Sequence, residues 1–170
     1  IALGEWKIRP ASRARSGTRS YEVDIIVTSG TPCTMAAKQV TATIPIVMAS
    51  VGDPLGTGLV TSLARPTGNV TGWSILSPEL TQKLLQMVTE TSPRAKQTAF
   101  LVNPRNPSSA NNFKAAEIAA KALKITLQKY EANNLDGIKN SFASMAKKGI
   151  ATVAVPVDSI YSHNYAVIAV

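Results

Sequence analysis

Short apolar runs alternate with amphipathic stretches along most of the chain. The runs are rich in β-branched residues and predict strands at residues 23–27, 44–48, 69–74, 97–102, 125–129 and 151–155. Between them, helical spacing and capping residues predict helices at about residues 31–40, 56–63, from Ser77 onward, 110–123, 135–147 and from Ser159 onward. Residues 1–20 have no such period, and we expect them to be irregular.

Two of the predicted helices begin with the same local pattern. Thr31 and Ser77 each stand just before a proline, and we expect each to act as the N-cap with the proline in the first helical position. The expected inward positions recur at helical spacing and are Leu80, Leu84, Met87, Val88, Ile138, Phe142 and Met145.

The alternation of strands and helices predicts right-handed crossovers and mainly parallel sheets. Two strand–helix units precede the strand at 69–74, and two more follow the helix that begins near Ser77, with a third interrupted. We therefore expect an α/β fold of two lobes, each incomplete, joined near residues 72–77. The expected segments are an irregular basic stretch at 1–20, a first lobe at 21–74 and a second lobe at 75–170.

The composition is that of a chain that can bury a core. Of 170 residues, 45% are hydrophobic and 16% are charged, which argues against disorder. No apolar run approaches the roughly 18 residues that a membrane span requires. The single cysteine, Cys33, excludes an internal disulfide and a multi-cysteine zinc site. We expect Cys33 to be a small buried residue.

The formal net charge is +8, and much of it lies in one segment. Residues 7–19 contain five basic residues and no acid, a pattern found both in nucleic-acid or lipid contacts and in solvated segments. Because no aromatic residues are interleaved, we favour a solvated or disordered segment and expect no nucleic-acid partner. Residues 1–6 do not have the pattern of a secretory signal peptide.

Polar loops follow the predicted strands at their carboxyl ends, where open parallel sheets bind ligands. The loops are Ser29-Gly30-Thr31, Gly52-Asp53, Asn103 to Ser109 and Asp158-Ser159. A helix start offers free N–H groups and a positive dipole end, which suit a carboxylate. Asp53 and Asp158 offer acceptors for an ammonium or hydroxyl group. This pattern predicts a zwitterion held between two lobes, although ordinary caps and turns have the same residue types.

The sequence gives little support to catalysis. We expect His163 to be a surface residue, because no acid is placed beside it. No nucleophile elbow, phosphate loop or dinucleotide fingerprint is present. We therefore expect no catalytic residue, no metal site and no cofactor. Asn69-Val-Thr71 matches a glycosylation acceptor that is frequent by chance, and Trp73 fits either a cleft wall or buried packing at the hinge.

Several short motifs together resemble a known family. They are Val-Asp-Ile-Ile-Val at 23–27, Gly-Thr-Pro at 30–32, Ile-Pro-Ile-Val at 44–47, Gly-Asp-Pro at 52–54, Leu-Ala-Arg-Pro-Thr-Gly-Asn-Val-Thr-Gly at 63–72 and Leu-Val-Asn-Pro-Arg-Asn-Pro at 101–107. In this combination residues 22–165 resemble the substrate-binding proteins of ABC transporters, of the type that includes tryptophan- and tyrosine-binding proteins.

The resemblance implies a type I periplasmic-binding-protein fold, with two Rossmann-like lobes hinged around a cleft. It implies a receptor that binds a small solute, such as an aromatic or hydrophobic amino acid, and delivers it to an ABC permease. The location expected is periplasmic, or extracytoplasmic and membrane-associated. By this resemblance and the loop pattern together, the expected ligand-binding residues are Ser29, Gly30, Thr31, Pro32, Asp53, Asn103, Asn106, Pro107, Ser108 and Asp158.

Other interpretations remain at this point. A ligand-sensing domain of a transcriptional regulator would share the fold, although residues 1–20 do not resemble a helix-turn-helix. An enzyme would need a glycine-rich phosphate loop or a positioned base. A truncated product would have no binding activity. Because a lobe that lacks a strand leaves a sheet edge exposed, a homodimer through exposed edges is also considered.

Overall fold

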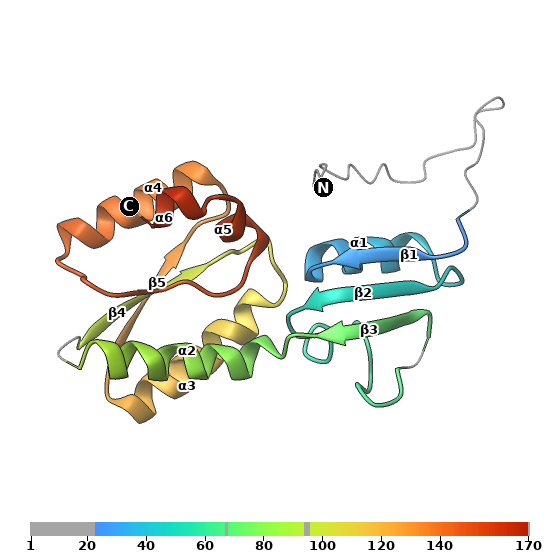
Figure 1. The fold of residues 1–170 in the computed structure, drawn as a ribbon, viewed down its shortest axis with the longest axis horizontal. Helices are drawn as coiled ribbons and strands as arrows, with labels where there is room; N and C mark the ends of the chain where they lie inside the picture. Colours follow the sequence, from blue (N-terminus) through green and yellow to red (C-terminus); the bar gives the residue numbers. More distant parts are fainter. Residues whose placement is uncertain (1–22, 67, 94–95, 170) are drawn as a thin grey trace.

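The chain forms two parallel sheets, as the alternating pattern predicted. The computed structural model describes residues 23–66, 68–93 and 96–169. Sheet A has the order β1-β2-β3, from strands β1 (Ile26–Ser29), β2 (Ile46–Val51) and β3 (Val70–Ser74). Sheet B has the order β5-β4-β6, from β4 (Gln97–Val102), β5 (Thr126–Glu131) and β6 (Val153–Ala154). All pairings are parallel, and the two sheets lie in separate lobes (Figure 1).

One helix packs with sheet A and the others belong to the second lobe. The helices are α1 (Thr31–Val40), α2 (Ser77–Thr91), α3 (Ser109–Leu123), α4 (Leu135–Lys147), α5 (Ser159–His163) and α6 (Tyr165–Ile168). Helices α2 and α3 cover one face of sheet B, while α4 and α6 lie on the other (Figure 1). The first lobe runs from β1 to β3 and includes α1 and the loop after β2, and the second lobe comprises α2 and the residues after it.

Sheet B is covered on both faces, and its central strand shows this. Phe100 and Val102 point toward Leu85 of α2 and Ala116 of α3, while Ala99 and Leu101 point toward α4. Five of the six residues of β4 are buried. A strand buried on both sides carries a continuous apolar run, which is why the sequence placed the bounds of β4 correctly.

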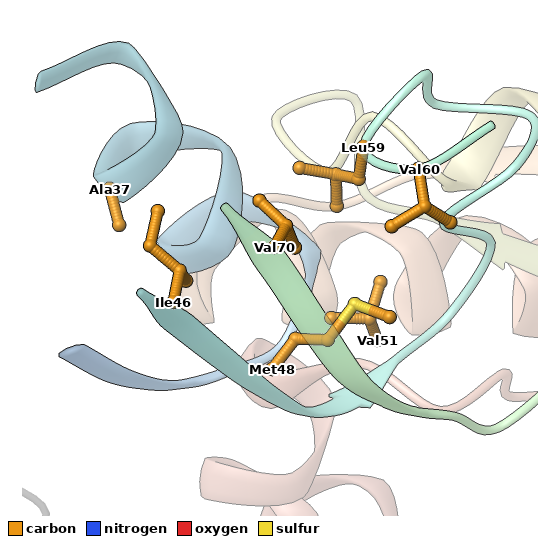
Figure 2. Close-up of a cluster of buried hydrophobic side chains, with 7 residues drawn as sticks. All are labelled: Ala37, Ile46, Met48, Val51, Leu59, Val60 and Val70. Carbon is orange, nitrogen blue, oxygen red and sulfur yellow. The ribbon is translucent and has the colours of Figure 1, made fainter. Parts of the chain in front are cut away.

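Sheet A is covered on one face by α1 and by the loop that follows β2. Its core contains Ala37, Ile46, Met48, Val51, Leu59, Val60 and Val70 (Figure 2). On the opposite face, Ile25, Val27 and Trp73 are 56%, 72% and 75% exposed. This exposure contradicts one of the two sequence-based interpretations of Trp73, namely buried packing at the hinge.

The helix expected at residues 56–63 is wrong: the structure has turns and bends there. Gly58 has a positive φ of 70°, and Asp53 accepts a hydrogen bond from the Gly56 N–H, so the backbone turns instead of coiling. The apolar residues that suggested a helix pack into the core as the neighbours Leu59 and Val60, which are 2% and 3% exposed (Figure 2).

Two expected caps and one expected burial are also wrong. Gly30 and Leu76 are the N-caps of α1 and α2, so Thr31 and Ser77 are helical residues whose hydroxyls bond elsewhere. Cys33 is exposed, because α1 presents Thr31, Thr34 and Ala37 to the sheet and turns Cys33 away from it.

Of the expected inward positions on α2, two pack in the core and two do not. Leu84 and Val88 contact the core of sheet B, but Leu80 and Met87 are half exposed, and Leu85 is the fully buried position. On α4, Ile138 and Met145 are buried and Phe142 packs against them, as expected. The basic segment at 1–20 lies outside the described residues.

The loop after β2 yields a stability prediction. Leu59→Ala should lower the free energy of unfolding by about 2–5 kcal/mol, because it leaves a cavity in a packed core. Leu63→Ala, at a side chain that is 44% exposed in the same loop, should change it by no more than about 0.5 kcal/mol. Urea unfolding followed by circular dichroism measures both, and equal effects would contradict the loop's role in the core.

Candidate functional site

The candidate site lies where the carboxyl ends of the strands of the two sheets approach each other. The strands of sheet A run toward the second lobe, and the chain crosses between the lobes after β3 (Figure 1). Ile75 N–H donates to Val51 O and Ser77 N–H donates to Gly52 O, so the crossover stays attached to the end of β2. This attachment fixes where the second lobe begins relative to the first.

Thr31 and Ser108 bring the starts of two helices together across the lobes. Their hydroxyl oxygens are 2.8 Å apart, and the side chains are 2% and 1% exposed. Thr31 begins α1, and Ser108 is the N-cap of α3. Each helix start carries a positive dipole end and N–H groups without intrahelical acceptors. Two positive helix ends therefore lie beside one buried pair of hydroxyl groups.

The hydroxyl pair has one more hydrogen than it uses. Thr31 Oγ1 accepts from the Gly52 N–H at 3.2 Å, and one of the two O–H groups donates to the other oxygen. Within the described residues, the second O–H has no acceptor. A buried donor without an acceptor is costly, so this place suits an acceptor that a ligand would supply.

Asp53 forms a second contact across the lobes. Its Oδ2 accepts from Asn111 Nδ2 of α3 at 2.7 Å, and its Oδ1 accepts from the Gly56 N–H at 2.8 Å. Next to it, Ser77 Oγ of α2 donates to Asn112 Oδ1 at 2.7 Å. Asn111 and Asn112 were not among the residues expected from the sequence, although two adjacent amides at the start of a helix that follows a polar loop are a usable signal.

Two glycines give the second lobe room to approach the first. A Cβ atom at Gly52 would lie 2.7 Å from Ser77 Oγ and 3.2 Å from Ser108 Oγ. A Cβ atom at Gly56 would overlap Asp53 Oδ2 and Asn111 Nδ2. Any larger side chain at either position would therefore separate the polar groups that meet there.

Asp158 is the centre of a separate cluster within the second lobe. It is 5% exposed and accepts from Asn103 Nδ2 at 3.1 and 3.2 Å, from Asn106 Nδ2 at 2.7 Å and from the Ile160 N–H at 2.9 Å. As N-cap of α5, it ties the end of β6 to the loop after β4. Its carboxylate is fully occupied by donors of its own lobe.

Tyr161 lies beneath this cluster and donates its hydroxyl to Ala132 O at 3.1 Å. Burial, together with the nearby negative charge of Asp158, raises the pKa of Tyr161 well above its ordinary value. The side chain of Tyr161 is therefore neutral in the folded protein.

The expected site residues thus fall into distinct groups. Thr31 meets Ser108 across the lobes, whereas Asn103, Asn106 and Asp158 bind one another. Gly30 is the N-cap of α1 at the end of β1. The side chains of Ser29, Pro32 and Pro107 are exposed at the same strand ends.

Other candidate chemistry lies elsewhere or is absent from the described residues. His163 is exposed, and its Nδ1 lies 2.8 Å from Ser159 O. In the described ranges, no three His, Cys, Asp or Glu residues gather as a metal site would require, and no helix there has the length and apolarity of a membrane span. Asn69 of the glycosylation pattern donates to Thr41 O and Ile44 O.

Two hollows are lined by residues other than those that bond across the lobes. One, of about 430 Å³, is at the amino-terminal ends of the strands of sheet A, between Ala42, Pro45, Pro66 and Asn69. The other, of about 260 Å³, is lined by Pro156, Tyr161 and Tyr165. Neither contains the groups that cross between the lobes.

Removing the Asp158 carboxylate should destabilise the second lobe. Asp158→Ala leaves the amides of Asn103 and Asn106 and a helix start without their acceptor, and should lower the free energy of unfolding by about 1–3 kcal/mol. Asp24→Ala, at an exposed position, is the matched control and should change it by no more than about 0.5 kcal/mol. Chemical denaturation measures both, and a neutral Asp158→Ala would contradict the described cluster.

Stability should decline in alkaline solution because of Tyr161. Its native pKa lies above the unfolded value of about 10, so its contribution is complete below pH 10 and is lost as the pH rises further. From pH 10 to 11, the wild type should lose up to about 1.4 kcal/mol more than Tyr161→Phe. Parallel losses in the two proteins, in urea titrations at each pH, would be contrary to this expectation.

Comparison with known proteins assigns the chain to a family. The model of the family described as ABC transporter substrate binding protein matches residues 17–170. A tyrosine-binding protein of Clostridioides difficile is 32% identical over 146 residues, which are 84% of this chain and 38% of that protein.

Solved structures give the same fold. A Streptococcus pneumoniae ABC domain in complex with L-Trp superposes with a TM-score of 0.79 at 23% identity, over 88% of this chain and 51% of that one. A conserved domain protein from Vibrio cholerae gives 0.69 at 30% identity, over 75% and 42%. The ligand-free, open structure of a Clostridium difficile substrate binding protein with adhesive properties gives 0.51 at 27% identity, over 83% and 47%.

The chain therefore spans about two fifths to one half of the length of these relatives. With a family match that covers residues 17–170 and two lobes built on parallel sheets, the chain belongs to the ABC transporter substrate-binding protein family.

Proposed function

We propose that this chain is the solute-binding part of an ABC uptake transporter and that it binds a small solute, an aromatic or hydrophobic amino acid, between its lobes. The observation that carries the proposal is the buried Thr31–Ser108 pair, which joins two helix starts across the lobes and has an unused hydroxyl hydrogen. The names of two relatives, a tyrosine-binding protein and a domain in complex with L-Trp, support an amino acid as the ligand.

A ligand carboxylate would lie beside this pair, at the two helix starts. It would accept the free hydroxyl hydrogen and N–H groups of the first helical turns, where the dipole ends favour an anion. Ser29, Gly30 and Pro32 would shape the side of the first lobe, and Pro107 would shape that of the second.

Asp53 is the better partner for a ligand ammonium group, and Asp158 has another role. Asp53 accepts two hydrogen bonds and is partly exposed, so its carboxylate retains acceptor capacity. Asp158 is buried and already occupied, and in this proposal it holds Asn103 and Asn106 in place for contact with the solute. All ten residues expected from the sequence keep a place in the proposed site.

Binding would act by population shift. A ligand that contacts both lobes stabilises the arrangement in which the lobes meet, and only this differential affinity moves the equilibrium. In this role the chain is a binding protein and not an enzyme, and it needs no cofactor, metal or nucleic acid.

The partner and location follow from the family. Substrate-binding proteins of this kind are extracellular, periplasmic or membrane-associated and work with ABC transporters; the partner proposed here is a permease in the membrane. A homodimer is a further proposal, favoured by β1, which pairs only with β2 among the described strands and leaves an edge free.

Ligand-dependent thermal unfolding tests the proposal. At about 100 times its dissociation constant a ligand adds about 2.7 kcal/mol, which in a domain of this size should raise the Tm by roughly 5–10 °C. The panel is tyrosine, tryptophan, phenylalanine and leucine, with lysine and glutamate for comparison. The shift should shrink in Ser108→Ala and persist in Thr71→Val, where an exposed hydroxyl is removed from β3.

Each other result is also informative. A cooperative transition that no amino acid moves would refute amino-acid binding by this chain. An unchanged Tm shift in Ser108→Ala would mean that the ligand does not bind beside Ser108. A chain without a cooperative transition would have no binding activity of its own.

A further inference from the structure

We propose that the hydrogen bond between Asp53 and Asn111 is a latch between the lobes, and that Asn111 is a positioning residue that sets ligand affinity without touching the ligand. The inference rests on the proposed binding function and adds to it a residue that determines how readily the lobes close. Asn111 was not among the residues expected from the sequence.

The contact between the lobes is polar, whereas the packing within each lobe is apolar. One apolar cluster belongs wholly to the first lobe, and the other two lie wholly in the second. The lobes meet instead through the Thr31–Ser108 and Asp53–Asn111 contacts, beside the crossover. Because water can replace polar contacts when lobes part, such an interface opens more readily than a core does.

Asn111 is held in the orientation that the latch needs. Its neighbour Asn112 is 4% exposed and accepts from Ser77 Oγ at 2.7 Å, which fixes the first turn of α3 against α2. Asn111 then reaches Asp53 with its amide at 2.7 Å. A hydrogen bond to a carboxylate is stronger than one between neutral groups. The Asp53–Asn111 contact therefore contributes a large share of the attraction between the two lobes.

Gly56 makes the approach possible. A side chain there would occupy the space in which the Asp53 carboxylate and the Asn111 amide meet. The Gly56 N–H also donates to the other oxygen of Asp53 at 2.8 Å and holds the carboxylate toward α3. The loop after β2 is therefore the surface that α3 contacts, and the contact is made by the side chain of Asn111.

The consequence for binding follows from population arithmetic. If the closed arrangement is the competent one, the apparent dissociation constant rises in proportion as the closed fraction falls. Asn111→Asp places two carboxylates where one amide met one carboxylate and should open the lobes. The reversed pair, Asp53→Asn with Asn111→Asp, keeps a carboxylate and an amide face to face, and the new amide's oxygen can still accept from the Gly56 N–H.

The experiment measures the distance between the lobes directly. Spin labels at Gln39→Cys on α1 and Lys139→Cys on α4, both exposed positions, are placed in a Cys33→Ser background. Pulsed electron–electron double resonance gives the distribution of distances between the two labels without ligand. Titration calorimetry with L-tyrosine gives the affinity. Asn140→Asp on the exposed side of α4 is the matched control for the same chemical change, and Asn111→Ala removes the bond without adding charge.

We expect Asn111→Asp to shift the distribution to longer distances and to weaken L-tyrosine binding about tenfold or more. Asn111→Ala should do both to a smaller extent, and Asn140→Asp should do neither. The reversed pair should restore the short distance, which a merely structural defect would not allow.

An unchanged distance in Asn111→Asp or Asn111→Ala overturns the proposal, as does a reversed pair that stays open. The two proposals fail separately. Distances that respond as expected in a chain that binds no L-tyrosine or other amino acid support the latch and refute the proposed ligand. Binding that persists with unchanged distances supports the ligand and refutes the latch.

Discussion

Parallel pairing in both sheets is the constraint on which the rest of the structure depends. Because every strand of a parallel sheet ends on the same edge, the loops after β1 and β2 come together on one lobe, and those after β4 and β6 on the other. The crossover after β3 then turns these two edges toward each other. The meeting of Thr31 with Ser108, far apart along the chain, follows from this topology and not from local sequence.

The polar interface between the lobes separates two requirements that a binding protein must meet. In the proposed function, rigidity comes from the apolar clusters that stay within one lobe, and the change of arrangement takes place where hydroxyls, amides and carboxylates meet. Asp158 belongs to the first requirement: saturated by its own lobe, it shapes the loop after β4. Asp53 belongs to the second, because its carboxylate bonds across the lobes.

Sequence reasoning succeeded where one local signal decides the outcome. The apolar run of β4 and the helical spacing of α4 gave their bounds, because burial of both faces of a strand and of one face of a helix leaves clear periodic marks. It failed at 56–63, where glycines and adjacent Leu59 and Val60 form a core loop. It placed the strand-end loops of the candidate site, and the adjacent amides of Asn111 and Asn112 could have been singled out. The partner of Asn111 could not, because Asp53 lies 58 residues away and no local pattern links the two.

The unequal covering of the two sheets gives the molecule an uneven distribution of local stability. Sheet B is enclosed by helices on both sides, whereas sheet A has Val27 and Trp73 facing solvent. The backbone amides of β4 therefore open to solvent only with the whole second lobe, while those near β1 can open in smaller, cheaper fluctuations. We therefore expect the first lobe, which contains Thr31 and Asp53, to open locally before the second.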